Sequence, residues 1–244
     1  MDKDRSRTGS DTGRLPDTDP VLRRELIHHL SGFLTKQRYE KMAAVLENRT
    51  RYITVVLEDI YQPHNASAVL RSCDGFGVQD AYIIENRNTY EINPGVELGT
   101  SSWLSLHTFN QGSYNTPETV GYLRDRGYRI AATSPHTNGT ALEDFDLFKG
   151  KTAVFFGNEL EGLSEELLED ADEHIRIPMY GFVESFNISV SCALTLHHLT
   201  YKLRGLPLDW RLSREEKEEI MLHWLRGSIK RWRTIEEEWK KNRL

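Results

Sequence analysis

The sequence contains no long apolar run and only two cysteines in 244 residues. No stretch approaches the roughly 18 apolar residues of a membrane-spanning helix, so we expect no membrane partner. The first 20 residues have mixed charge and no apolar core, unlike a signal or transit peptide. Cys73 and Cys192 fall in apolar helical patterns, which indicates buried free thiols and a reducing, cytoplasmic setting.

Several signatures of metal and nucleotide chemistry are also missing. The nine histidines show no Cys/His or His-x-x-x-His spacing, so we expect no metal site. No Gly-x-Gly-x-x-Gly fingerprint or Gly-x-Ser-x-Gly elbow occurs, which excludes the common dinucleotide and hydrolase sites. The glycine-containing segment 157–162 is not followed by the Gly-Lys-Ser/Thr of a phosphate-binding P-loop.

The net charge of −6 is unevenly distributed along the chain. Residues 1–52 carry a net charge of +3 and residues 200–244 carry +4, whereas residues 53–199 carry −13. Such asymmetry favours a polyanionic partner for the two flanks. The charge alone is equally compatible with flanking helices that merely have solvated Lys/Glu faces.

Hydrophobic periodicity divides the chain into four parts. We expect a disordered tail over 1–19, an N-terminal helical extension over 20–50, an α/β domain over 51–204 and a C-terminal helical extension over 205–244. In the last part, Ser213 and Thr234 each stand three residues before a glutamate, a capping-box pattern that predicts a helix start at both positions.

The expected α/β domain alternates short apolar runs with helical patterns. The strand-like runs are 53–57, 81–84, 128–133, 152–157 and 174–179, with a further strand near 104–109. The helical patterns are 65–76, 116–126, 164–171 and 187–204. This alternation indicates an α/β fold with a mostly parallel sheet.

Three loops at the carboxyl ends of expected strands carry unusual polar residues, and ligands bind at this edge of open α/β sheets. The first loop offers Asn65 as a helix N-cap and Arg71, either a surface arginine or a phosphate-gripping one. In the second, Gly157 and Gly162 allow a tight turn around acidic residues, and an ordinary turn remains an alternative. The third, RIPMYGFVESFNISVS, precedes a helix whose first turns are built from small residues.

Together, PHNASAVLRSCDGFGV (63–78), AVFFGNELEGLSEE (153–166) and IRIPMYGFVESFNISVSCAL (175–194) resemble the three motifs of one family. These are the SpoU/TrmH-type RNA ribose 2′-O-methyltransferases of the SPOUT superfamily, and the match covers roughly residues 50 to 204. The resemblance implies a parallel α/β sheet with a C-terminal deep trefoil knot, the cofactor S-adenosylmethionine, a homodimer, and RNA rather than DNA as partner. The small residues after the third loop would permit that tight threading and packing.

The resemblance also assigns site residues by motif position. Catalytic positions fall on Arg71, Asn65, Glu159, Ser185 and Asn187. Cofactor contacts fall on Thr133, Gly157, Ile177 and Phe186, the last replacing a leucine common in the family. Arg71 could act as a general base or as a phosphate clamp, and the clamp is favoured because a guanidinium is almost always protonated. RNA contacts are expected from the cationic flanks at Arg23, Arg24, Lys36, Arg38, Lys230, Arg231 and Arg233.

The expected function is therefore S-adenosylmethionine-dependent 2′-O-ribose methylation of RNA. Residues before position 50 form no substantial substrate-binding domain, which favours tRNA, with a D-loop guanosine as the family-level expectation. Three alternatives stay open: an rRNA 2′-O-ribose methyltransferase, a catalytically silent RNA-binding protein of the same fold, and a generic nucleotide-binding α/β domain.

Overall fold

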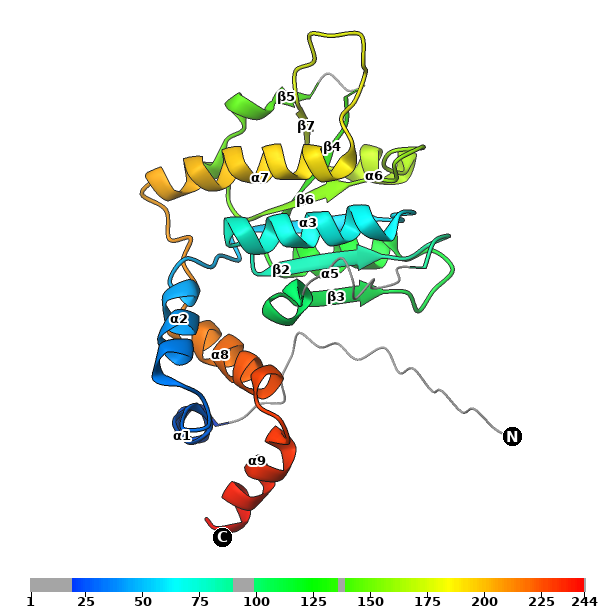
Figure 1. Ribbon diagram of the computed structural model, residues 1–244. Coiled ribbons are helices and arrows are strands. Elements are labelled where there is room, and N and C mark those ends of the chain that lie inside the picture. The colour runs from blue at the N-terminus through cyan, green and yellow to red at the C-terminus, as the bar shows by residue number, and fades with distance from the viewer. Residues whose placement is uncertain (1–18, 90–98, 136–138, 244) are drawn as a thin grey trace, which may run out of the picture. The chain divides into compact units, whose positions relative to one another are not determined.

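The computed structural model describes residues 19–89, 99–135 and 139–243 (Figure 1). The tail expected over 1–19 lies outside the described residues except for Asp19. The described chain forms two compact units. One comprises Tyr52–Leu208, and the other joins the two flanks, within Leu15–Arg51 and Asp209–Leu244.

A seven-stranded sheet forms the centre of the first unit, in the order β3-β2-β1-β6-β4-β7-β5. All six strand pairings are parallel, as the registers Val55↔Ala81 and Val55↔Val154 on either side of β1 illustrate. The expected α/β fold with a mostly parallel sheet is thereby confirmed. The strands are β1 (Ile53–Glu58), β2 (Asp80–Ile84), β3 (Ser105–Phe109), β4 (Arg129–Thr133), β5 (Thr140–Ala141), β6 (Thr152–Phe156) and β7 (Glu173–Arg176).

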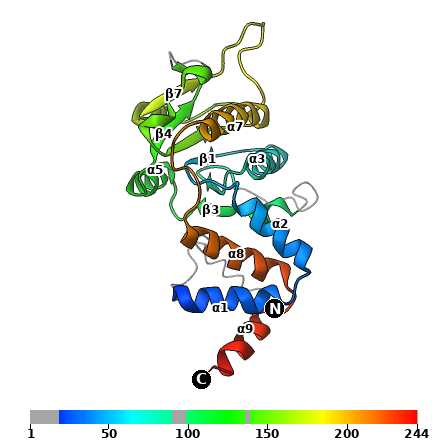
Figure 2. The ribbon, with the colours of Figure 1, turned by 90° about the vertical axis from the view of Figure 1, so that its left-hand side faces the viewer.

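Helices cover both faces of this sheet. On one face, α3 (Pro63–Phe76) packs against α7 (Ile188–Gly205). On the other lie α5 (Thr116–Asp125) and α6 (Glu165–Asp170), which share a core with β1, β2, β4 and β6. Figures 1 and 2 show α3 and α7 on the opposite side of the sheet from α5. The described part of this unit also contains three short 3-10 helices, Thr100–Trp103, Leu142–Asp144 and Leu147–Lys149.

The central strands β1 and β6 are buried along their whole length. A parallel strand covered by helices on both faces reads as a continuous apolar run, which is why the sequence pattern identified these two strands well. The strand expected over 174–179 is shorter in the structure, because β7 ends at Arg176. Residues 177–179 therefore leave the sheet and become available to line a cavity.

The second unit consists of four helices from the two ends of the chain: α1 (Pro20–Ser31), α2 (Lys36–Leu46), α8 (Arg214–Ser228) and α9 (Trp232–Lys241). Helix α8 contacts both α1 and α2, and α9 packs on α1. Each of the unit's four tryptophans has an arginine over its indole ring, a favourable cation–π arrangement. The pairs are Arg211 with Trp210, Arg49 with Trp224, Arg226 and Arg233 with Trp232, and Arg243 with Trp239.

Only one of the two expected capping boxes exists. Ser213 caps α8, since its hydroxyl accepts the Glu216 N–H at 3.2 Å and Glu216 accepts the Ser213 N–H at 2.7 Å. The box expected at Thr234 was wrong, because α9 already begins at Trp232. Arg231, with a φ of 60°, is the N-cap residue of that helix, three residues before the N-cap that the pattern indicated.

Replacing Ser213 by alanine should therefore lower the free energy of unfolding by about 1 kcal/mol, the usual value of a lost N-cap. Thr234→Ala is the matched control, because its hydroxyl caps nothing and alanine has the higher helix propensity. Denaturant unfolding followed by circular dichroism measures both. Equal losses in the two variants would contradict this assignment of the caps.

Candidate active site

Side chains from all three motifs meet at the carboxyl edge of the sheet, in the segments that follow β1, β6 and β7. Asn65 Nδ2 donates a hydrogen bond to Glu159 Oε1 over 2.7 Å, and Asn187 Nδ2 donates to Asn65 Oδ1 over 3.2 Å. The other Glu159 oxygen accepts the backbone N–H of Tyr61 at 3.3 Å. Segments far apart in sequence are thus joined in one hydrogen-bonded chain, here called the Asn65–Glu159–Asn187 chain.

The structure places Asn65 inside α3, so the expectation that it caps this helix was wrong. Gln62 is the N-cap residue and Pro63 takes the first helical position, which suits proline because the N–H there needs no partner. Asn65 is buried, and its Nδ2 also approaches Gln62 Oε1 at 3.2 Å. Since it does not cap the helix, the Asn65 amide is free to bridge the other two motifs.

The loop that carries Glu159 is closed by a very tight turn. Asn158 and Gly162 exchange two backbone hydrogen bonds, each 2.9 Å long. A Cβ on Gly157 would lie 2.1–2.3 Å from backbone atoms of Gly162 and Leu163, so no other residue fits without moving the loop. Gly162 has a φ of 75°, a conformation that glycine adopts without strain. The two glycines therefore set the position of Glu159.

Asn187 has two functions at the start of α7. Its Oδ1 caps the helix by accepting the Ser189 N–H at 2.9 Å. The same oxygen accepts the Ser189 hydroxyl at 2.6 Å, while Nδ2 points to Asn65. The third motif is thus held against the first by a residue that also fixes the direction of α7.

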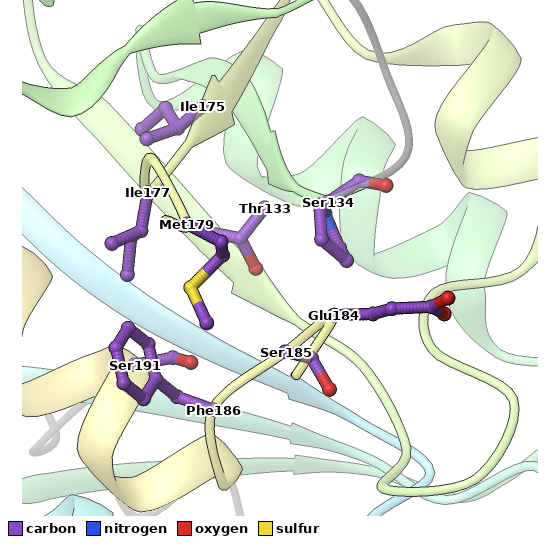
Figure 3. A pocket seen from close by; sticks show the side chains of 10 residues that line it. Thr133, Ser134, Ile175, Ile177, Met179, Glu184, Ser185, Phe186 and Ser191 are labelled. Carbon is purple, nitrogen blue, oxygen red and sulfur yellow. The ribbon is translucent and has the colours of Figure 1, made fainter. Parts of the chain in front are cut away.

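A small cavity lies beyond the ends of β4 and β7, beside the loop that leads into Asn187 (Figure 3). It encloses about 70 Å³. Its lining includes three of the four expected cofactor residues, Thr133, Ile177 and Phe186, together with Ser185. The other lining residues are Ser134, Pro135, Ile175, Met179, Glu184 and Ser191. The remaining expected residue, Gly157, belongs to the Glu159 turn and does not line this space.

Arg71 stands apart from the Asn65–Glu159–Asn187 chain. Helix α3 carries it nearly two turns beyond Asn65, and its side chain is exposed. Across the part of the chain that the structure describes, no hydrogen bond or ion pair holds its guanidinium. The structure therefore gathers Asn65, Glu159 and Asn187 into one cluster and presents Arg71 to solvent.

The expected RNA-contacting residues fall into two groups. Arg23 is only 5% exposed and forms ion pairs with Glu215 and Glu219 of α8, at 3.7 and 3.6 Å. It belongs to the packing between α1 and α8, and its burial contradicts the expected contact with RNA. The others are at the surface: Arg24, Lys36, Arg38, Lys230, Arg231 and Arg233.

The two cysteines are free and buried, as the sequence indicated. They face each other between α3 and α7, and burial, then the neighbouring Cys73, raises the pKa of the Cys192 thiol. A thiol held in its protonated form is a poor nucleophile. Within residues 19–89, 99–135 and 139–243, no group of side chains could hold a metal ion. No helix in these ranges is long and apolar enough to cross a bilayer.

Comparison with known proteins assigns the sequence that forms this site to a family. The sequence profile described as the SpoU rRNA Methylase family matches residues 52–197, which include all three motifs. The chain belongs to the SpoU methylase family. The resemblance noted in the sequence is thereby confirmed.

Individual SpoU relatives match over most of their length. A tRNA (guanosine(18)-2′-O)-methyltransferase of Borreliella burgdorferi is 39% identical over 218 residues, covering 89% of this chain and 97% of that protein. The enzyme of the same name from Thermus thermophilus is 34% identical, covering 79% and 97%. The crystal structure of a TrmH/SpoU tRNA modifying enzyme of A. aeolicus superposes with a TM-score of 0.70 at 30% identity, covering 80% and 98%.

Some residues around the SpoU motifs were not identified from the sequence. Asn158 Oδ1 accepts the Leu160 N–H at 2.8 Å, and this hydrogen bond stabilises the turn that contains Glu159. Tyr61 binds Glu159 through its backbone N–H, so the identity of its side chain gives no indication of this contact. An asparagine directly after a glycine at a strand end is typical of a turn, and this pattern could have identified Asn158.

Gly157→Ala should displace the Glu159 turn, because its new methyl group would overlap three backbone atoms. Overpacking of this kind typically costs about 1–3 kcal/mol, and we expect a loss of several degrees in thermal unfolding temperature. Gly181→Ala is the control, since no atom lies within 4 Å of its added Cβ. An unfolding temperature for Gly157→Ala equal to that of the control would contradict the observed closure of the turn.

Proposed function

We propose that this chain transfers a methyl group from S-adenosylmethionine to the ribose 2′-hydroxyl of guanosine 18 in tRNA. The observation that carries the proposal is the Asn65–Glu159–Asn187 chain beside a cavity at the carboxyl edge of a parallel sheet. Relatives named for this reaction are 30–39% identical over most of the chain. The family description mentions rRNA, but these full-length relatives favour tRNA. The free, buried thiols fit a reducing cytoplasm.

The chemical types of the residues around the cavity suit S-adenosylmethionine. Ile177, Met179 and Phe186 offer apolar surface to an adenosine, and Glu184 offers a carboxylate to a cationic group. When bound, the cofactor supplies an electrophilic methyl group. The present volume of about 70 Å³ is well below the roughly 300–1,000 Å³ of ordinary ligand sites. We therefore propose that the loop over residues 179–186, which supplies several lining residues, moves outward when the cofactor binds.

A ribose hydroxyl loses its proton only with difficulty, so the protein must position it and help that proton to leave. We assign Arg71 the role of a clamp on a phosphate of the RNA. Its guanidinium is exposed and open to a phosphate, and arginine serves as a fixed hydrogen-bonding fork better than as a general base. Glu159, Asn65 and Asn187 hold the three loops, and Ser185 offers a hydroxyl at the cavity.

The six exposed cationic residues on the flanks provide a surface for the RNA backbone. Arg24 lies 3.9 Å from Glu218, which leaves its guanidinium loosely held. Arg233 stacks over Trp232, and the neighbouring Lys230 and Arg231 are exposed. Phosphate contacts of this kind orient an RNA without reading its sequence. Residues 53–199 carry a net charge of −13, so we propose that the helical unit supplies most of the electrostatic attraction.

We propose that the chain acts as a homodimer through α7. Val190, Leu194 and Tyr201 are exposed, and their spacing puts them along one side of this helix. The stripe continues toward Phe186, which is also exposed. An apolar stripe on the helix that follows the third motif fits a second copy of the chain better than it fits water.

We also infer the deep trefoil knot of the SPOUT fold in the C-terminal part of the first unit. Support comes from membership of the family and from the path of the chain, which leaves β7 beside β4 and returns to pack α7 on α3. Knotted chains are rare, so the inference needs a direct test. Stretching the protein from both ends should leave a tightened knot and an extension shorter than the contour length.

Wild-type protein should transfer labelled methyl to the ribose of guanosine 18 in an unmodified tRNA transcript. We expect Arg71→Ala to slow transfer on the order of 100-fold, which is the usual effect of losing one positioned hydrogen-bond donor. Arg71→Lys keeps the charge without the planar fork and should be intermediate. Arg126→Ala, which removes another exposed arginine, is the control and should retain the wild-type rate.

The pattern of label separates the competing functions. Label on large-subunit rRNA fragments and none on tRNA would retain the chemistry and overturn the substrate. Measurable cofactor binding without label on any RNA would favour a silent RNA-binding protein. Near-normal turnover of Arg71→Lys at unchanged RNA affinity would rule out the bidentate clamp.

Leu194→Glu should convert the protein to a monomer, because it places a charge in the middle of the proposed apolar interface. Sedimentation velocity at micromolar concentration measures the change. Phe148→Glu, which alters an exposed apolar residue outside α7, is the control and should remain dimeric. A wild-type protein that sediments as a monomer would disprove the dimer.

A further inference from the structure

A second cavity of about 240 Å³ opens at the same edge of the sheet, on the side of β1 and β2. It is separate in its lining from the cavity beside Asn187. Residues from the loops that follow β1, β2 and β6, and from the segment before α5, form its walls. Its volume is below that of most drug-sized ligand sites, which suits a small planar group such as one nucleobase.

The floor of this cavity is rigid and its carboxylates are satisfied by the protein. Glu58 accepts the Thr116 hydroxyl at 2.6 Å, the Ser164 hydroxyl at 2.8 Å and the Ser164 N–H at 2.9 Å. One Asp59 oxygen accepts the backbone N–H groups of residues 86, 87 and 88 at 3.2, 2.8 and 2.7 Å. Asp59 has a φ of 55°, a conformation uncommon for a residue other than glycine. These acids shape the floor and leave recognition to the residues above them.

The mouth of the cavity carries a guanidinium and a carboxylate side by side. Arg87 forms an ion pair with Glu161 and is steadied by Asp59 Oδ2 at 3.3 Å from its Nε. The two side chains remain 70% and 61% exposed. A guanidinium has five N–H donors and a carboxylate has about four acceptor positions, so the pair keeps capacity for a ligand.

An aromatic ring lies at the same mouth. Tyr114 is partly exposed, and its hydroxyl is fixed by Ser164 and Glu166. Burial, followed by the Glu166 hydrogen bond, raises the pKa of the Tyr114 phenol, so the hydroxyl stays a neutral donor. The ring therefore has a defined position in which a planar ligand can stack against it.

The cavity is physically connected to the Asn65–Glu159–Asn187 chain. Glu161 follows Glu159 by two residues in the same tight turn. Asn158 Nδ2 donates to the Asp59 carbonyl oxygen at 3.0 Å, which fastens this turn to the cavity floor. A nucleotide whose ribose lies near Glu159 could thus place its base on the Glu161 side of the turn.

We propose that this cavity binds the guanine base of the nucleotide to be methylated. Guanine presents two neighbouring donors, N1–H and the 2-amino group, next to the acceptor O6. The Glu161 carboxylate accepts from the donors, Arg87 donates to O6, and Tyr114 stacks on the ring. Adenine has an acceptor at N1 and a donor at position 6, so the same pair rejects it. The inference rests on the proposed methylation of a guanosine.

The test compares tRNA carrying guanosine or inosine at the target position, since inosine lacks only the 2-amino group. Full-length wild-type protein should prefer guanosine, with a ratio of kcat/KM values of about ten-fold, as expected for one specific base contact. Glu161→Gln should lower kcat/KM for guanosine and bring this ratio close to one. Arg87→Ala should lower kcat/KM for both RNAs, because both retain O6.

Glu165→Gln is the matched control, an exposed glutamate nearby in sequence that does not line the cavity, and it should keep the wild-type ratio. The selectivity ratio reports recognition and is insensitive to a general loss of stability. Active wild-type protein with an unchanged ratio in Glu161→Gln would overturn the base pocket while leaving the proposed function intact. A wild-type protein that methylates no tRNA would overturn both.

Discussion

The Glu159 carboxylate is the interaction on which the rest of the site depends. One of its oxygens holds Asn65 at 2.7 Å and the other holds the N–H of Tyr61, so it fastens the loop after β6 to the loop after β1. Asn65 in turn receives Asn187, which fixes the start of α7. Hydrogen bonds to an ionised group are among the stronger ones, and their loss would free all three loops together. The site is therefore a cooperative unit whose members cannot be ranked by single contacts.

Asp59 connects these hydrogen-bonded loops with the loop that follows β2. Its strained backbone and its three accepted N–H groups fix the loop after β2, and its carbonyl receives Asn158 from the Glu159 turn. Strain of order 1–3 kcal/mol persists only where surrounding contacts determine the conformation, and it concentrates at functional sites. The buried Asp59 thus connects the Asn65–Glu159–Asn187 chain with the cavity that carries Arg87 and Glu161.

The sequence was informative wherever local pattern and burial agree. The apolar runs of the central strands and the cap at Ser213 were predicted correctly, because neighbouring residues decide them. Predictions failed where a distant contact decides the outcome. Arg23 is drawn into the interface between α1 and α8, which no local pattern reveals. Asn65 was misjudged because its partner Glu159 lies 94 residues away. The motif resemblance located the site, but the pairing within it needed coordinates.

The segment over residues 179–186 contributes both to the cavity proposed for the cofactor and to the apolar surface proposed for the dimer. It exposes Tyr180 almost fully and Phe182 completely, while Met179 and Phe186 line the cavity of about 70 Å³. Burying one such side chain is worth roughly 1.5–3 kcal/mol of free energy. The isolated chain does not gain this hydrophobic stabilisation, because these aromatic side chains stay exposed. In the proposed dimer, cofactor entry would move the residues of this segment that line the cavity, and a partner subunit would cover its exposed aromatic residues. Because both events act on one loop, cofactor binding and dimer contacts are expected to be thermodynamically coupled.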